Sequence, residues 1–179
     1  MASLAVVGLG YVGLIHAVGF TLIGHRVAGY DVNRAVVESL RRGKPHIHEP
    51  GLDEALRKAL ESGRLKFTDS LEEAVAESEA AFIAVGTPSA PDGSADLSQV
   101  EAAARAVGRA MRGKRWYLVV VKSTVPPGTT EGLVARAIAE ESGAELGVGF
   151  SVASNPEFLR EGAAPVSYTH LTLPTNREV

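Results

Sequence analysis

The fold of this chain is decided by the stretch Leu4-Ala5-Val6-Val7-Gly8-Leu9-Gly10-Tyr11-Val12-Gly13-Leu14. Its apolar start is typical of a strand buried on both faces, and a helical pattern follows over residues 11–23. Gly8, Gly10 and Gly13 stand between the two in the G-x-G-x-x-G spacing of a dinucleotide-binding turn. In such a turn the diphosphate lies against the free N–H groups of the helix N-terminus. The stretch therefore predicts a dinucleotide site.

A second feature of the same kind is Asp31, at the end of the next apolar run. It follows Gly10 by about 20 residues, the spacing expected for an acid at the tip of the second strand. There its carboxylate would accept hydrogen bonds from ribose hydroxyls and repel a 2′-phosphate, so NAD is favoured over NADP. Two alternatives stay open. Arg34 can accommodate such a phosphate, and Asp31 can serve merely as the N-cap of the next helix.

Composition narrows the class of protein. The 179 residues suffice for one domain, and 45% apolar with 22% charged residues is typical of a globular protein. A net charge of −3 gives no reason to expect a nucleic acid or an anionic membrane as partner. We find no bilayer-spanning run and no signal peptide, so we expect a cytoplasmic protein. The sequence has no cysteine, which excludes disulfides and thiolate metal sites.

Strand-like and helical patterns alternate along most of the chain, which predicts an α/β fold with a doubly wound parallel sheet of the Rossmann type. We assign residues 1–165 to this domain and expect residues 166–179, which break the pattern, to form a loosely attached tail. The expected strands cover 4–7, a run ending at 31, 65–68, 80–85, 117–121 and 148–153, and the expected helices cover 11–23, 33–42, 53–62, 70–78, 97–111 and a segment ending near 142.

Polar loops follow several of these strands at their carboxyl ends, the edge where open α/β sheets bind ligands. Ser123 fits a ligand site and a helix cap about equally well. Thr124 is the better candidate, because Pro126 and Pro127 make the turn rigid. Glu157 and Glu161 would share one face if their segment is helical, and two carboxylates there could divide acid/base and positioning roles. The alternative is a solvated helical turn.

The histidines suggest no metal or nucleophile site. His46 and His48 lie too near prolines to form a helical ligand pair, so a surface loop is expected there. His16 and His25 are expected at helix and loop surfaces. We identify no Ser–His–Asp arrangement and no metal site.

Five segments together resemble the N-terminal NAD-binding domain of the UDP-glucose/GDP-mannose dehydrogenase family, over residues 1 to about 164. The resemblance implies an enzyme that oxidises the C6 alcohol of UDP-glucose or a related nucleotide sugar to a carboxylate with two NAD, and a homodimer whose state in this fragment stays open. The segments are Gly8-Leu9-Gly10-Tyr11-Val12-Gly13-Leu14, Glu49-Pro50-Gly51-Leu52, Val85-Gly86-Thr87-Pro88, Lys122-Ser123-Thr124-Val125-Pro126-Pro127-Gly128-Thr129 and Asn155-Pro156-Glu157-Phe158-Leu159-Arg160-Glu161-Gly162.

The resemblance also implies roles for matching positions. Cofactor contacts are implied for Gly8, Gly10, Tyr11, Val12, Gly13, Asp31, Val85, Gly86, Thr87, Pro88, Ser123 and Glu161. Thr124 would help to orient a catalytic water, Glu157 would assist proton transfer or hydrolysis, and Glu161 would act on the nicotinamide side. Substrate contacts are implied for Glu157, Phe158, Leu159 and Arg160. Val36 departs from the family, whose members often place a basic residue there.

A larger departure concerns the second α/β domain of the family, which supplies a thiol nucleophile and most of the nucleotide-sugar pocket. This sequence contains no such domain and no cysteine, so the covalent route through a thiohemiacetal and thioester is closed. We therefore expect NAD binding without turnover, and a truncation with a foreign or frame-shifted end at residues 166–179. Three alternatives remain: a GDP-mannose dehydrogenase fragment, a UDP-N-acetylhexosamine dehydrogenase fragment, and a stand-alone NAD-binding module.

Overall fold

Short apolar runs form the strands of one parallel sheet in the computed structural model, which describes residues 1–159 and 162. The expectations for Arg160, Glu161 and residues 163–179 lie outside the described residues. The strands are β1 (Ser3–Val7), β2 (Arg26–Tyr30), β3 (Leu65–Thr68), β4 (Ala80–Ile83), β5 (Tyr117–Val121) and β6 (Phe150–Ser154).

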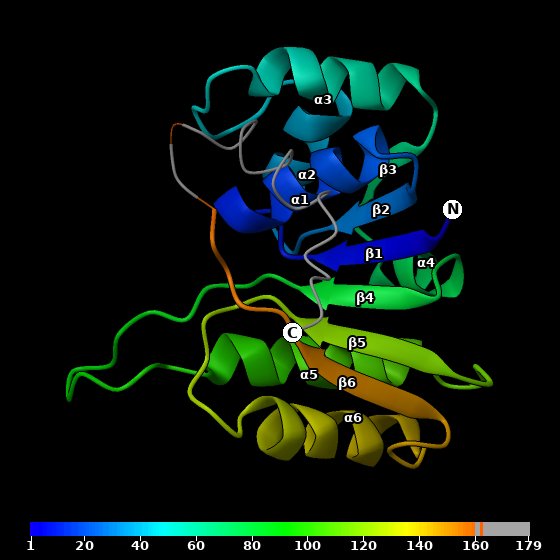
Figure 1. Cartoon of the computed structure of the whole chain (residues 1–179), viewed down its shortest axis with the longest axis vertical. Coiled ribbons are helices and arrows are strands. Elements are labelled where there is room, and N and C mark those ends of the chain that lie inside the picture. Colours follow the sequence, from blue (N-terminus) through cyan, green and yellow to red (C-terminus); the bar gives the residue numbers. More distant parts are fainter. Residues whose placement is uncertain (160–161, 163–179) are drawn as a thin grey trace, which may run out of the picture.

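The sheet has the order β3-β2-β1-β4-β5-β6, with β1 in the middle (Figure 1). Every pairing is parallel, and Ala5 of β1 lies opposite Ala28 of β2 on one side and Ala81 of β4 on the other. After β1 the chain forms β2 and then β3 on one side of β1. It then crosses to the other side of β1, where β4, β5 and β6 follow, so the strand order reverses between β1 and β4. Ligands bind outside the carboxyl ends of the strands at such a switch point. The predicted doubly wound fold is confirmed.

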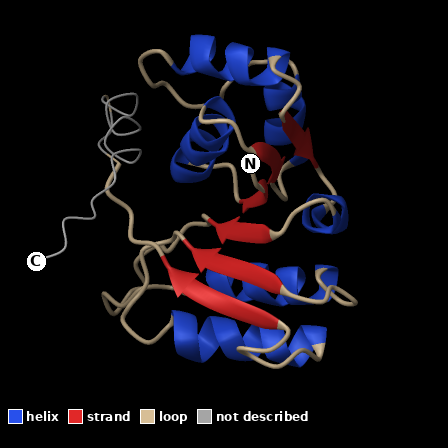
Figure 2. Cartoon of the chain, turned by 45° about the vertical axis from the view of Figure 1, so that its right-hand side comes forward, coloured by secondary structure: helices blue, strands red, loops and turns tan. Residues whose placement is uncertain are grey.

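Helices cover both faces of this sheet (Figure 2). One apolar core lies under the first three helices and the other under the last three. Successive residues of β1 serve the two cores in turn: Val6 belongs to the first, whereas Ala5 and Val7 belong to the second. The helices are α1 (Tyr11–Leu22), α2 (Arg34–Arg41), α3 (Leu52–Glu61), α4 (Leu71–Ala76), α5 (Ser98–Ala110) and α6 (Ala135–Ser142).

The ends of the elements follow local chemistry. Ser70 caps α4 by accepting a hydrogen bond from the N–H of Glu73 at 3.2 Å, as its spacing indicates. The helix that ends at Ser142, as expected, begins with a π-helical turn, η1 (Thr130–Val134). The expected start of the last strand needs correction. The last strand begins at Phe150 and not at residue 148, because the backbone turns at Gly147 (φ 83°), whose N–H donates to the Phe150 carbonyl.

Some features of the described part bear on the setting of the site. No helix within residues 1–159 has the length and apolar character needed to cross a membrane.

The loop between β4 and α5 projects from the body on the side to which the β4 arrowhead points (Figure 1). The sheet edge at the switch point is therefore bordered by loops that follow β1, β4, β5 and β6.

Candidate functional site

The glycine turn joins β1 to α1 by close backbone contacts. Gly8 has a φ of 93°, a region that side chains disfavour, and a Cβ there would approach the Ala84 carbonyl oxygen to 2.8 Å. A Cβ on Gly13 would overlap the carbonyl oxygen of Gly8. By contrast, no atom of the described residues would lie within 4 Å of a Cβ on Gly10. The turn is thus closely packed against the protein at Gly8 and Gly13, whereas the space beside Gly10 is open among the described residues.

The open side of the turn suits an anion. Gly10 is the N-cap of α1, and no side chain of the described residues caps this helix. The first N–H groups of a helix lack partners within it, and the helix dipole favours negative charge at this end. A diphosphate can therefore lie at Gly10 without displacing protein atoms, and the residues present fit a dinucleotide cofactor.

Asp31 lies directly after β2 and is anchored on both oxygens. Oδ2 accepts a hydrogen bond from the N–H of Leu9 at 2.7 Å, and Oδ1 accepts one from the N–H of Asn33 at 2.8 Å. Asn33, not Asp31, caps α2 by accepting from the N–H of Ala35. Each carboxylate oxygen can accept a further hydrogen bond. The N-cap alternative for Asp31 is therefore wrong.

Arg34 does not pair with Asp31. Its guanidinium Nε lies 3.4 Å from Oδ2 of Asp69, and its side chain is 84% exposed. It lies on the first turn of α2 and is largely exposed to solvent. Val36, the departure from the family pattern, is half-buried against the core under α1 to α3.

A hollow of about 480 Å³ lies at the switch point, a size within the range of ligand pockets. Small side chains of α5, namely Ala102, Ala103 and Ala106, form one wall. Gly8 and Gly10 of the glycine turn and Asp31 after β2 also line it, and Val85 and Gly86 come from the loop after β4. The structure thus brings together five residues that the sequence places in a cofactor site. Thr87 and Pro88 follow on the same loop, and Tyr11 and Val12 begin α1, outside the lining of this hollow.

The loops after β4 and β5 are joined by Ser123. Its hydroxyl donates to the carbonyl oxygen of Val85 at 2.6 Å, and its N–H donates to that of Ile83 at 3.2 Å. Ser123 therefore does not cap a helix, which corrects the alternative left open by the sequence. Thr124 follows it and is exposed. The two hydroxyl residues thus differ: one fixes the loops and the other faces solvent at the crevice.

A buried charged cluster lies where β5 ends. Lys122 is only 3% exposed, and its Nζ donates to the Pro156 carbonyl oxygen at 2.9 Å. The same Nζ lies 3.3 Å from Oε2 of Glu157, while Nε2 of His16 lies 4.0 Å from that oxygen. The expectation that His16 lies on a helix surface is wrong, because its side chain is 4% exposed and lies against Phe20 and near Glu157. Burial lowers the pKa of His16.

Glu157 lies in a segment, 155–159, that forms neither helix nor strand. Glu157 therefore does not lie on a helical face that it could share with Glu161, and Glu161 itself lies outside the described residues. Oε1 of Glu157 accepts a hydrogen bond from the N–H of Leu159. Phe158 is 81% exposed, whereas Leu159 is half-buried. Arg160 lies outside the described residues.

Glu49 is a residue whose position the sequence did not predict. It is 3% exposed, and its Oε2 accepts hydrogen bonds from the Tyr11 hydroxyl at 2.7 Å and from the N–H of Gly162 at 2.9 Å. Glu49 therefore links the start of α1 to the segment after β6. In the sequence it stands directly before Pro50 and Gly51, the turn that starts α3, within one of the five segments that carry the family resemblance.

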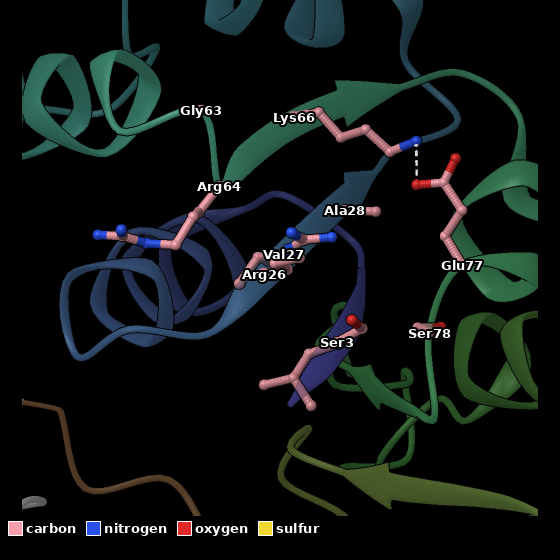
Figure 3. A pocket seen from close by; sticks show the side chains of 10 residues that line it. Ser3, Arg26, Val27, Ala28, Gly63, Arg64, Lys66, Glu77 and Ser78 are labelled. Carbon is pink, nitrogen blue, oxygen red and sulfur yellow. Dashed lines mark ion pairs between the residues drawn. The ribbon is translucent and has the colours of Figure 1, made fainter. Parts of the chain in front are cut away.

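A second hollow, of about 520 Å³, lies at the amino edge of the sheet (Figure 3). It is lined by Arg26, Arg64, Lys66 and Glu77, but its charges do not converge. Lys66 Nζ lies 2.6 Å from Glu77 and 2.8 Å from Glu73, and the Arg64 side chain points away from both Lys66 and Glu77. Within the described residues no group of three His, Asp or Glu side chains could hold a metal ion.

Comparisons with known proteins match this geometry. The model of the UDP-glucose/GDP-mannose dehydrogenase family, NAD binding domain, matches residues 2–172. A UDP-glucose 6-dehydrogenase of Rhizobium meliloti is 48% identical over 90% of this chain, and a GDP-mannose 6-dehydrogenase of Pseudomonas aeruginosa is 42% identical over 92%. The solved structure of a UDP-glucose dehydrogenase from the hyperthermophilic archaeon Pyrobaculum islandicum is 73% identical over 94% of the chain, with a TM-score of 0.89. The chain spans 36% to 38% of the length of these three proteins.

Proposed function

Because the chain belongs to the UDP-glucose/GDP-mannose dehydrogenase family and forms its NAD-binding domain, we propose that it is the cofactor-binding part of a UDP-glucose 6-dehydrogenase. The observation that carries the proposal is that the open glycine turn and the anchored Asp31 line the same hollow at the switch point. The 73% identity to the Pyrobaculum islandicum protein supports UDP-glucose over GDP-mannose.

On the cofactor side, the lining of the hollow and the contacts of Asp31 support the roles proposed here. The diphosphate would lie at Gly10 against the first N–H groups of α1, with Tyr11 and Val12 beside it. Asp31 would accept hydrogen bonds from the ribose hydroxyls, because each of its two anchored carboxylate oxygens can accept one more hydrogen bond. The adenine ring would fill the apolar space between Val85, Gly86 and the alanines of α5. Thr87, Pro88 and Ser123 would line the rest of the crevice.

On the substrate side, the chain offers acid/base groups near the ends of β5 and β6. NAD, when bound, accepts the hydride that leaves the alcohol carbon. Glu157 would take part in moving the proton, because its carboxylate is held beside Lys122 at the sheet edge where we propose that the cofactor binds. Thr124 would orient a water through its exposed hydroxyl. Phe158, Leu159 and Arg160 would approach the nucleotide sugar, and Glu161 the nicotinamide side.

We further propose that the 179 residues alone bind NAD without oxidising a sugar. The thiol route to the carboxylate needs a cysteine, and this sequence has none. A nucleotide-sugar pocket built largely by the rest of the family's chain would also be incomplete here, since the chain spans 36% to 38% of its relatives.

Calorimetry and an absorbance assay test the proposal together. Titration of the chain should give heat with NAD at millimolar concentration and less with NADP, and UDP-glucose should yield no NADH. Addition of the separately produced remainder of a family enzyme should restore NADH formation, with UDP-glucose preferred over GDP-mannose. A preference for GDP-mannose would favour the alternative dehydrogenase. NAD binding with no restored turnover would favour a stand-alone module, and absence of heat with NAD would contradict the proposal.

A further inference from the structure

Three ionisable side chains from three different elements meet in the buried cluster at the end of β5. Lys122 comes from the end of β5, Glu157 from the segment after β6, and His16 from the second turn of α1. Oε2 of Glu157 is their common point, at 3.3 Å from the lysine nitrogen and 4.0 Å from Nε2 of the histidine. The lysine and histidine side chains are 3% and 4% exposed, and the carboxylate side chain is 15% exposed. Because a buried charge is costly unless it is paired, the free energy of this cluster depends on which side chains carry protons.

The tautomer of His16 is fixed by its own helix. Nδ1 lies 2.7 Å from the carbonyl oxygen of Val12, which can only accept a hydrogen bond. Nδ1 must therefore carry a proton and donate it. In the neutral ring Nε2 is then a lone-pair acceptor, and this atom faces Glu157.

The charge of the cluster favours the neutral ring. Lys122 and Glu157 already compensate each other, so a proton added to His16 would leave a net positive charge in a buried place. Burial lowers the pKa of His16, Lys122 lowers it further, and the Val12 hydrogen bond and Glu157 act in the opposite direction. On the far side His16 contacts the ring of Phe20, which separates it from His25.

Two acceptors thus face each other across 4.0 Å, too far for a direct hydrogen bond and with no proton of their own to share. Oε2 of Glu157 is also buried without a hydrogen-bond partner among the described residues. Buried acceptors are normally satisfied, and one water between two polar atoms more than about 3.5 Å apart can satisfy both.

We infer that His16 and Lys122 are positioning residues for Glu157, and that Nε2 of His16 and Oε2 of Glu157 together bind one water molecule. Lys122 orients the carboxylate through the ion pair, and His16 fixes the second acceptor of the water. The water then donates both of its protons, so its oxygen lone pairs point away from the two side chains. The site supplies an oriented water next to Glu157 at the crevice.

The significance of this water for a reaction rests on the proposed function, but its existence does not. In the proposed dehydrogenase, Glu157 takes part in proton transfer, and a water held against its Oε2 is the nearest proton carrier. The binding of that water depends on three side chains of this chain and on no cofactor. A test on the ligand-free chain therefore separates the two proposals.

Nuclear magnetic resonance of the chain with 15N-labelled histidine provides the test. Long-range 1H–15N spectra report the tautomer and charge of His16 as pH is changed, and His16→Asn assigns its signal. We expect the neutral ring with the proton on Nδ1 at pH 7. Lys122→Met should raise the pKa of His16 and Glu157→Gln should lower it, each by about one pH unit. A crystal structure should show one water within hydrogen-bond reach of both acceptors.

Several results would overturn the inference. An imidazolium at pH 7 would mean a direct ion pair with Glu157, and a proton on Nε2 would mean a direct hydrogen bond. Shifts of the same sign in both variants would point to a general loosening of the structure. If Lys122→Met does not fold, as judged by circular dichroism, Glu157→Gln decides alone, since residues 155–159 belong to no helix or strand. Failure of the chain to bind NAD would remove the proposed function and leave this test unaffected.

Discussion

Two hollows of nearly equal size, about 480 and 520 Å³, lie at opposite edges of one sheet, yet they differ in chemistry. At the carboxyl edge the chain enters α1 at Gly10, so the amino end of a helix and open space lie near an anchored acid. At the amino edge the chain leaves α3 and α4, near Gly63 and Glu77, and side chains such as Lys66 are already paired. Volume does not distinguish the two hollows. The direction of the chain does, because helices begin at one edge and end at the other.

The largest test of this contrast is Gly13→Ala. A methyl group there overlaps the Gly8 carbonyl oxygen, so the turn must open, and we expect the free energy of unfolding to fall by about 3 kcal/mol. Denaturant unfolding measures it. Gly132→Ala is the matched control, since the described residues leave open space around its Cβ, and it should change stability by no more than about 1 kcal/mol. Equal stability of the two variants would show that the turn is not closely packed.

Gly10→Ala should separate binding from folding. The added methyl group meets no atom of the described residues, so the free energy of unfolding should hardly change. The same methyl group would occupy the space proposed for the diphosphate, and NAD affinity should fall tenfold or more, equivalent to about 1.4 kcal/mol. Calorimetric titration with NAD measures this. Unchanged affinity would move the diphosphate away from Gly10.

Asp31→Asn should weaken NAD about tenfold and NADP less, because the charge that receives the ribose hydroxyls is lost. Titration of both cofactors gives the ratio. The control at the other edge is Arg26→Gln, which removes an exposed charge from the amino-edge hollow and should leave both affinities unchanged. An equal loss for NAD and NADP in Asp31→Asn, or any loss in Arg26→Gln, would break the contrast between the edges.

Tyr117→Phe probes the amino edge for stability alone. The Tyr117 hydroxyl lies 2.6 Å from that of Ser78, and burial raises the pKa of Tyr117 well above its ordinary value. Loss of this hydrogen bond should cost about 1 kcal/mol in unfolding free energy, while NAD affinity stays the same. Thermal or denaturant unfolding and an NAD titration on the same sample measure both. Weaker NAD binding would mean that the two edges are coupled through β5.

The smallest effect is expected from acid. Hydrogen bonds from Lys66 and Thr68 lower the pKa of Glu73, so its carboxylate form stabilises the folded state. That stabilisation is present above the ordinary pKa of 4.5 and is lost as pH falls through the lower folded value. Glu73→Gln should therefore reduce the loss of stability below about pH 4.5, seen in melting temperatures at several pH values. An unchanged acid profile would show that the interactions of Glu73 with Lys66 and Thr68 contribute nothing to stability.

Much of this molecule follows from local sequence. The strands at Leu65–Thr68 and Tyr117–Val121 were predicted to the residue, since apolar runs between turn residues mark buried strands. Gly8, Gly10, Asp31, Val85 and Gly86 were placed in a cofactor site, and the structure brings them to one hollow. Turn chemistry and spacing indicate Gly8, Gly10 and Asp31, whereas the cofactor roles of Val85 and Gly86 are implied by the family resemblance. All five residues lie near one edge because parallel strands end there.

The buried polar residues were harder to predict, because their surroundings come from distant parts of the chain. His16 was expected at a surface, although α1 is apolar on most of its circumference and such a helix is enclosed. Lys122 directly follows the apolar run of β5, and nothing local indicates that its charge is met by Glu157, far along the sequence. Glu49 likewise finds Tyr11 only through tertiary packing.

The hydrogen bond from Leu9 to Asp31 has a consequence for cofactor preference. Asp31, which would discriminate NAD from NADP, also holds the backbone of the loop that would bind the diphosphate. Cofactor preference and diphosphate binding therefore depend on the same carboxylate. Engineering this domain toward NADP by exchanging that acid alone would loosen the very loop that both cofactors need. A successful redesign must supply a new acceptor for the Leu9 amide before it supplies a new cation for the phosphate.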